Sequence, residues 1–73
     1  MARKKRRDTL PDSAVILLLV TGNPKRPHGA AYRRFERYFE GMTVEEYRDT
    51  VGYAKANADL WYDQDHGFIR VIE

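Results

Sequence analysis

The sequence predicts a small α+β domain made of a strand, three short helices and a second strand, with a disordered basic tail in front of it. Three observations lead to this prediction. A short run of branched apolar residues ends in a turn containing glycine and proline, two stretches with helical periodicity follow, and an apolar run closes the chain. The 73 residues suffice for one domain with a marginal core, so a partner subunit is an expected source of support.

Residues 1–12 are predicted to form the tail and residues 13–73 the folded domain. The first twelve residues have little apolar surface to bury, and they carry five basic residues against two acidic ones. The net charge is +3 over residues 13–40 and −4 over residues 41–73. A basic end joined to an acidic end is typical of an interaction arm attached to a body.

The run AVILLLV, Ala14 to Val20, is predicted to be a buried strand, because it is short, rich in branched side chains and followed by a turn. It is too short to span a bilayer, which takes about 20 residues. The polar stretch before it and the lack of a small-residue cleavage site oppose a signal peptide. Because the sequence also has no cysteine, we expect a cytoplasmic protein with no membrane partner.

The next stretch, GNPKRPHG, is predicted to be an extended connector on the surface. Asn23 and Arg26 each precede a proline, which disfavours helical geometry. A Walker-type loop cradles phosphate with backbone N–H groups, and Pro24 and Pro27 each lack one. The connector is therefore not expected to be a nucleotide-binding loop.

Ala30 to Glu40 is predicted to be the first helix, with Gly41 as its stop. At about 100° per residue, the rings of this stretch gather on one face and its arginines on the other. The rings are Tyr32, Phe35, Tyr38 and Phe39, and the arginines are Arg33, Arg34 and Arg37. Because the rings share the core side, they are not expected to stack on nucleic-acid bases.

The second helix is predicted from TVEE, in which Thr43 and Glu46 form a capping box, to Gly52. The third element, NADLWYDQDHG, is either a short helix from Asn57 to Gly67 or the first arm of a hairpin. The helix is favoured, because an aspartate lies in its first turn and a glycine follows its end.

FIRVI, Phe68 to Ile72, is predicted to be the second strand, with Arg70 facing solvent. It is expected to pair with the first strand in a two-stranded sheet that packs on the helices. The first strand would then keep a free edge that invites another chain. A homodimer weakened by a charge at Leu17 or Leu19, whichever faces outward, is therefore a candidate assembly.

The short elements NPKRP, RFERY, GMTVEE, ADLWYD and HGFIRV follow one another between Asn23 and Val71. In this arrangement the chain resembles a group of small uncharacterised proteins of bacteria and their phages. The resemblance implies a compact fold, and no activity or site residue comes with it. The arginine-rich tail lies outside these elements.

Catalysis and metal binding have little support in the sequence. His28 and His66 are the only histidines, and Ser13 is the only serine. The run DQDHG begins like a calcium loop but lacks its glycine and its final glutamate. We expect a protein that is not an enzyme and that has no catalytic residue, no metal and no cofactor.

The second and third predicted helices have the outline of a helix-turn-helix. Asp59, Asp63 and Asp65 in the third helix would oppose phosphate, so these helices are interpreted as packing elements with an acidic solvated face.

The basic half of the chain is the better candidate for function. It is predicted to contact phosphates of DNA or RNA, without sequence preference and with strong salt dependence. The alternative is a protein-interaction or dimerisation module whose tail only adds solubility. The predicted contact residues are Arg3, Lys4, Lys5, Arg6, Arg7, Lys25, Arg26, Arg33, Arg34 and Arg37.

Overall fold

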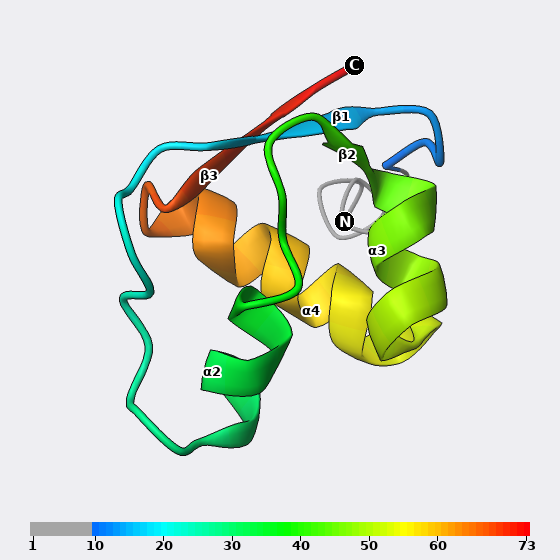
Figure 1. The fold of residues 1–73 in the computed structure, drawn as a ribbon. Coiled ribbons are helices and arrows are strands. Elements are labelled where there is room, and N and C mark those ends of the chain that lie inside the picture. The colour runs from blue at the N-terminus through cyan, green and yellow to red at the C-terminus, as the bar shows by residue number, and fades with distance from the viewer. Residues whose placement is uncertain (1–9) are drawn as a thin grey trace, which may run out of the picture.

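A computed structural model of the chain describes residues 10–73. In chain order its elements are β1 (Val15–Leu18), α2 (Ala30–Phe35), β2 (Met42–Thr43), α3 (Val44–Val51), α4 (Tyr53–Asp65) and β3 (Ile69–Ile72). The sheet forms one layer, and the helices lie together on one side of it (Figure 1). The predicted α+β class is therefore confirmed.

The antiparallel sheet has the order β2-β1-β3. The predicted pairing of the first and last strands is confirmed, with Leu17 opposite an exposed Arg70. The prediction of only two strands was wrong, because Met42 and Thr43 pair with Ile16 and Val15 on the other side of β1. β1 is thus the central strand, and the free edge predicted for it belongs instead to the strands beside it.

Helix α2 is shorter than predicted, since it ends at Phe35 and not at Glu40. The N–H group of Tyr38 donates to the carbonyl of Phe35 at 3.1 Å, so the chain tightens into a turn three residues long and leaves the helix. The turn carries the ring of Tyr38 into the core, while Phe39, predicted among the core rings, is exposed. Gly41 does not end the helix; with a φ of 86° it leads the chain into β2.

The predicted start of the second helix is confirmed in α3. The hydroxyl of Thr43 accepts a hydrogen bond from the N–H of Glu46 at 3.1 Å, and the Glu46 carboxylate accepts one from the N–H of Thr43 at 2.9 Å. Val44 and Tyr47 are buried on one face of this helix and Val51 is half-buried. The capping box therefore places α3 directly after β2, against the core.

Helix α4 begins at Tyr53, directly after Gly52, and not at Asn57 as predicted. Gly52 has a φ of 94°, which lets the chain turn from one helix into the next within a single residue. The helix runs to Asp65, and Gly67 follows with a φ of 74°. The helical alternative for this segment is therefore correct and the hairpin arm is wrong.

The core lies between the inner face of the sheet and the helices. Its buried apolar residues are Leu10, Ala14, Ile16, Phe35, Tyr38, Met42, Val44, Tyr47, Ala56, Leu60 and Ile69. Because Leu10 is buried, and because Asp12 forms an ion pair with Arg48, the packed part of the chain starts earlier than the predicted boundary at Ser13. The rest of the predicted tail lies outside the described residues.

Candidate nucleic-acid interface

The predicted contact residues separate into three sets. Residues 3–7 lie outside the part of the chain that the structure describes. Lys25 and Arg34 turn inward and pair with carboxylates. Arg26, Arg33 and Arg37 are exposed to solvent.

Lys25 is an internal cation. Its Nζ atom lies 2.6 Å from Oδ1 of Asp63, and the two side chains are 12% and 1% exposed. The same Nζ atom lies 4.3 Å from the ring centre of Tyr62 and 5.4 Å from that of Phe68, within cation–π range. The second carboxylate oxygen of Asp63 accepts a hydrogen bond from the Tyr38 hydroxyl at 2.7 Å. A single pair thus fixes the connector to α4.

Asn23 fixes the connector to α2 in the same way. Its amide nitrogen donates to the carbonyl of Tyr32 at 2.9 Å and to the carboxylate of Glu36 at 2.8 Å. Its amide oxygen accepts a hydrogen bond from the N–H of Lys25 at 3.0 Å. The segment is neither helix nor strand, as predicted, but side-chain bonds hold it in place.

Arg34 forms a two-point contact with Asp59. Its Nε and Nη2 atoms donate to the two carboxylate oxygens at 2.6 and 3.1 Å. This hydrogen bonding raises the pKa of Arg34 above its ordinary value. The Tyr47 hydroxyl also donates to Asp59, at 2.7 Å. The guanidinium is therefore held in one orientation, and its Nη1 group has no hydrogen-bond partner among residues 10–73.

The rings of Tyr38 and Tyr47 join these two ion pairs. They stack with centres 4.4 Å apart and an interplanar angle of 17°. Burial is the main cause that raises the pKa of each tyrosine well above its ordinary value. Both hydroxyls therefore stay protonated, and they donate to the carboxylates of Asp63 and Asp59.

The interpretation of α4 as a helix with an acidic solvated face was wrong for two of its three aspartates. Asp59 and Asp63 are buried, and only Asp65 is exposed. The sequence did contain a signal for this, because both aspartates fall at helical spacing on the face of Ala56 and Leu60. With their charges paired to Arg34 and Lys25, they no longer oppose the approach of phosphate.

Arg48 is a further internal cation, which the sequence did not reveal. It is buried, and its Nη1 atom lies 2.6 Å from Oδ1 of Asp12. Its Nε and Nη2 atoms donate to the amide oxygen of Asn57 at 3.1 and 2.8 Å. Asn57, which was predicted to cap the helix, therefore lies inside α4 and binds Arg48 instead.

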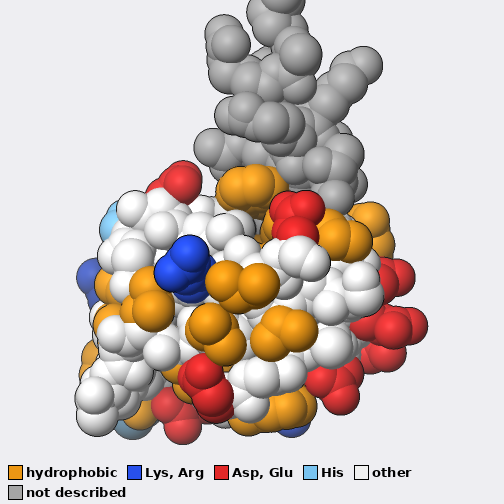
Figure 2. All heavy atoms as spheres, turned by 90° about the horizontal axis from the view of Figure 1, so that it is seen from above, with side chains coloured by type: hydrophobic (Ala, Val, Ile, Leu, Met, Phe, Trp, Pro, Cys, Tyr) orange, Lys and Arg blue, Asp and Glu red, His pale blue; other side chains and the backbone are white. Residues whose placement is uncertain are grey.

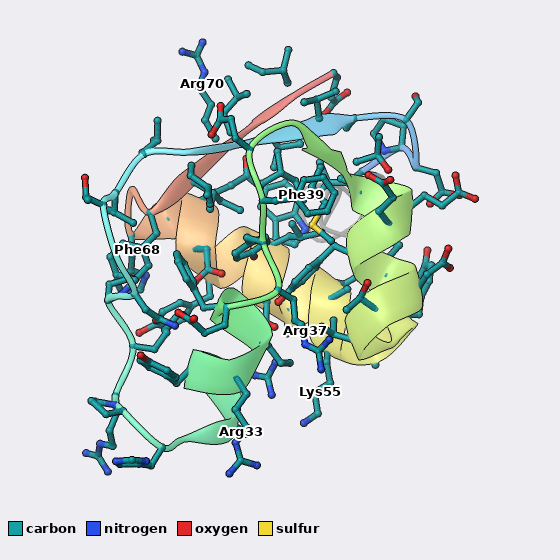
Figure 3. The ribbon with its side chains drawn as sticks, viewed as in Figure 1. Arg33, Arg37, Phe39, Lys55, Phe68 and Arg70 are labelled. Carbon is teal, nitrogen blue, oxygen red and sulfur yellow. The ribbon has the colours of Figure 1, made fainter. Side chains whose placement is uncertain are left out.

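Two of the exposed arginines share a hollow. Arg33, Arg34 and Arg37 line a depression of about 160 Å³ together with Thr50 and Val51, at the junction of α2 and the end of α3. Neither Arg33 nor Arg37 forms an ion pair within residues 10–73. Their side chains lie on the side of the molecule away from the sheet, as does that of Lys55, which the sequence did not single out (Figure 3).

A larger cleft lies between the connector, α2 and α4. Its volume is about 440 Å³. Ala31 and Ala58 contribute small apolar surfaces to it, Tyr62 contributes an aromatic surface, and Arg26 contributes an exposed charge. Arg34 lines both the cleft and the arginine hollow.

Comparisons with known proteins give no relative. No family model matches the chain, and no curated protein or solved structure shows significant similarity to it. Across the described residues, no helix is long and apolar enough to cross a membrane. In the same range, no three histidine, aspartate or glutamate side chains converge as metal ligands would.

Proposed function

We propose that the protein binds nucleic acid through phosphate contacts from Arg33 and Arg37, assisted by Arg26 and by the basic residues 3–7. The observation that supports this best is the hollow lined by three arginines. One of the three, Arg34, is already oriented by a carboxylate, and the other two have no internal partner in the described part of the chain. Guanidinium groups bind phosphate oxygens in a planar two-point geometry, so such a hollow suits phosphate.

The charge of the domain supports a local site and not a general attraction. Residues 10–73 contain eight lysines and arginines against ten aspartates and glutamates, which gives a net charge of −2. Since Lys25, Arg34 and Arg48 are already paired, phosphate would approach along the side that carries Arg33 and Arg37. The proposed role is non-enzymatic, without cofactor, and cytoplasmic, in keeping with a sequence that lacks cysteine.

The test is fluorescence anisotropy of labelled DNA and RNA with the full chain at several salt concentrations. The double variant Arg33→Gln/Arg37→Gln is expected to bind more weakly and to show a log–log salt slope smaller by about 1.4 for a single strand, since each lost phosphate contact removes about 0.7. Arg70→Gln removes one exposed arginine from the opposite side of the molecule and is the charge-matched control for Arg33→Gln and Arg37→Gln, each measured singly. Equal affinities for the double variant and this control would contradict the proposal.

A second candidate function is self-association through the outer face of the sheet. This face carries Leu19 and Ile72, which are 55% and 41% exposed, and the partly buried Leu17. Figure 2 shows hydrophobic side chains gathered beside a basic one on it, and Arg70 points out from the sheet (Figure 3). The described helices all lie on the other side (Figure 1), so a second copy would cover apolar surface that this part of the chain leaves bare.

Sedimentation equilibrium over a range of concentrations tests this candidate. We expect dimers that persist when residues 1–9 are removed and that weaken in Leu19→Lys, because a charge would then be buried in the interface. Leu17 and Leu19 both lie on the outer face, and Leu19 is the more exposed of the two, so it is the informative position. A protein that stays monomeric at every concentration would eliminate this candidate and leave the phosphate contacts untouched.

A further inference from the structure

We infer that the nucleic acid bound by this protein is single-stranded, with one base seated in the cleft between the connector and α4 while the neighbouring phosphate lies in the arginine hollow. This inference rests on the proposed function and specifies its ligand. The main support is that Arg34 lines both depressions, so a nucleic-acid strand that crosses Arg34 would contact both.

The volumes of the two depressions agree with a base in the cleft and a phosphate in the arginine hollow. The cleft has a volume of about 440 Å³, within the range of roughly 300 to 1,000 Å³ that small-molecule sites occupy. The arginine hollow is smaller, about 160 Å³. A nucleotide offers a base with flat faces and polar edges beside a compact charged phosphate; the larger depression has both alanine and polar side chains, and the smaller one is lined by arginines.

The surface chemistry of the cleft suits a base. Ala31 and Ala58 provide small apolar surface, and Arg26 lies at the cleft without an ion pair in the described chain. A guanidinium plane stacks on bases of any sequence. The Nη1 group of Arg34, which has no hydrogen-bond partner among residues 10–73, can donate to a phosphate or to a base edge.

The ring of Tyr62 already has two close neighbours, so it is not the surface on which we place the base. This ring lies against the ring of His66, with centres 3.9 Å apart and an interplanar angle of 16°. The Nζ atom of Lys25 lies 4.3 Å from the same ring centre. Because these two neighbours occupy the ring, the base would have to rest on the alanine surfaces and under Arg26.

The same geometry discriminates against a duplex. Bases in a duplex are paired and stacked inside it, so one would have to be extruded before it entered the cleft. Single strands and loops present bases that are already unstacked. A base under a guanidinium gains on the order of twofold to thirtyfold in affinity, and only the single strand gains it.

The experiment compares labelled single-stranded and duplex oligonucleotides, as DNA and as RNA, with three full-length proteins. Ala58→Leu fills the cleft without changing charge, at an exposed position of α4 where leucine is a good helix former. Ala54→Leu adds the same side chain at an exposed position of the same helix outside the cleft. Thermal unfolding of both variants is measured alongside, and similar midpoints are expected.

The expected result is that the unmodified protein prefers the single strand, and that Ala58→Leu loses about tenfold or more of that affinity while Ala54→Leu keeps it. Duplex binding is expected to be the same in all three proteins. Equal binding of duplex and single strand, or an Ala58→Leu protein that binds the single strand as tightly as Ala54→Leu, would overturn the inference and leave the phosphate contacts standing. Absence of binding to either form at low salt would refute the proposed function and this inference together.

Discussion

Replacing Lys25 by methionine would measure how strongly the internal ion pair holds the fold. Methionine keeps the length and apolar surface of the lysine stem but removes the ammonium group. The structure then leaves Oδ1 of Asp63 without its partner at a site where the aspartate side chain is 1% exposed. Removing one partner of a buried pair costs about 3 to 5 kcal/mol, because the remaining charge stays desolvated.

That loss is large for a domain of this size. A stability of about 0.05 to 0.15 kcal/mol per residue gives roughly 3 to 10 kcal/mol for the described residues. At about 4 to 8 °C per kcal/mol, a loss of about 3 kcal/mol lowers the unfolding midpoint by roughly 12 to 24 °C. Thermal and urea unfolding followed by circular dichroism would measure the change in the free energy of unfolding.

A second variant, Lys25→Met/Asp63→Asn, removes both charges of the pair. Asparagine removes the buried charge but can still accept the hydrogen bond from the Tyr38 hydroxyl, so the double variant is expected to be more stable than Lys25→Met alone. Lys55→Met, at an exposed position of α4, is the matched control and is expected to change stability by less than about 0.5 kcal/mol. If Lys25→Met lost no more stability than Lys55→Met, the reasoning about the pair would be wrong.

Three further predictions concern stability. Thr43→Ala removes the side chain that caps α3 and is expected to lower the free energy of unfolding, measured in urea, by about 1 kcal/mol. No change would mean that Thr43 does not stabilise α3. Burial raises the pKa of Tyr38 and Tyr47 in the folded state, so their contribution to the free energy of unfolding is complete below about pH 10 and is lost as the pH rises above it. The free energy of unfolding should then fall by up to about 1.4 kcal/mol per pH unit for each tyrosine, and Tyr38→Phe should halve this slope. Gly52→Ala, at a φ of 94°, should destabilise by about 1 to 2 kcal/mol through backbone strain, and an unchanged unfolding midpoint would show that the turn between α3 and α4 can relax.

The start of α3 follows from a local signal and was predictable, whereas β2 depends on a distant contact and was not. The capping box of Thr43 and Glu46 is complete within four residues, and it appears in the structure as expected. β2 is only two residues long, and it exists because Met42 meets Ile16 across the sheet. A contact between residues so far apart in the chain has no local sequence signature, so the third strand could not be predicted.

The same distinction explains how far the sequence located the arginine side chains in the fold. Helical periodicity assigned Arg33, Arg34 and Arg37 to one face, and all three do line the same hollow. Periodicity does not indicate that Arg34 finds a carboxylate 25 residues further along the chain, in α4. The inward turn of Lys25 has the same cause, because its partner Asp63 lies on that helix too.

These internal pairs bear on where function is to be sought. The elements NPKRP, RFERY and ADLWYD contribute Lys25, Arg34, Asp59 and Asp63, all of which the fold uses to join the connector and α2 to α4. The ion pairs therefore give these four charges a structural role, and their presence alone is no argument for binding. Arg33 and Arg37 have no such structural use among the described residues, so a large effect of replacing them on binding, with little effect on unfolding, would separate function from fold.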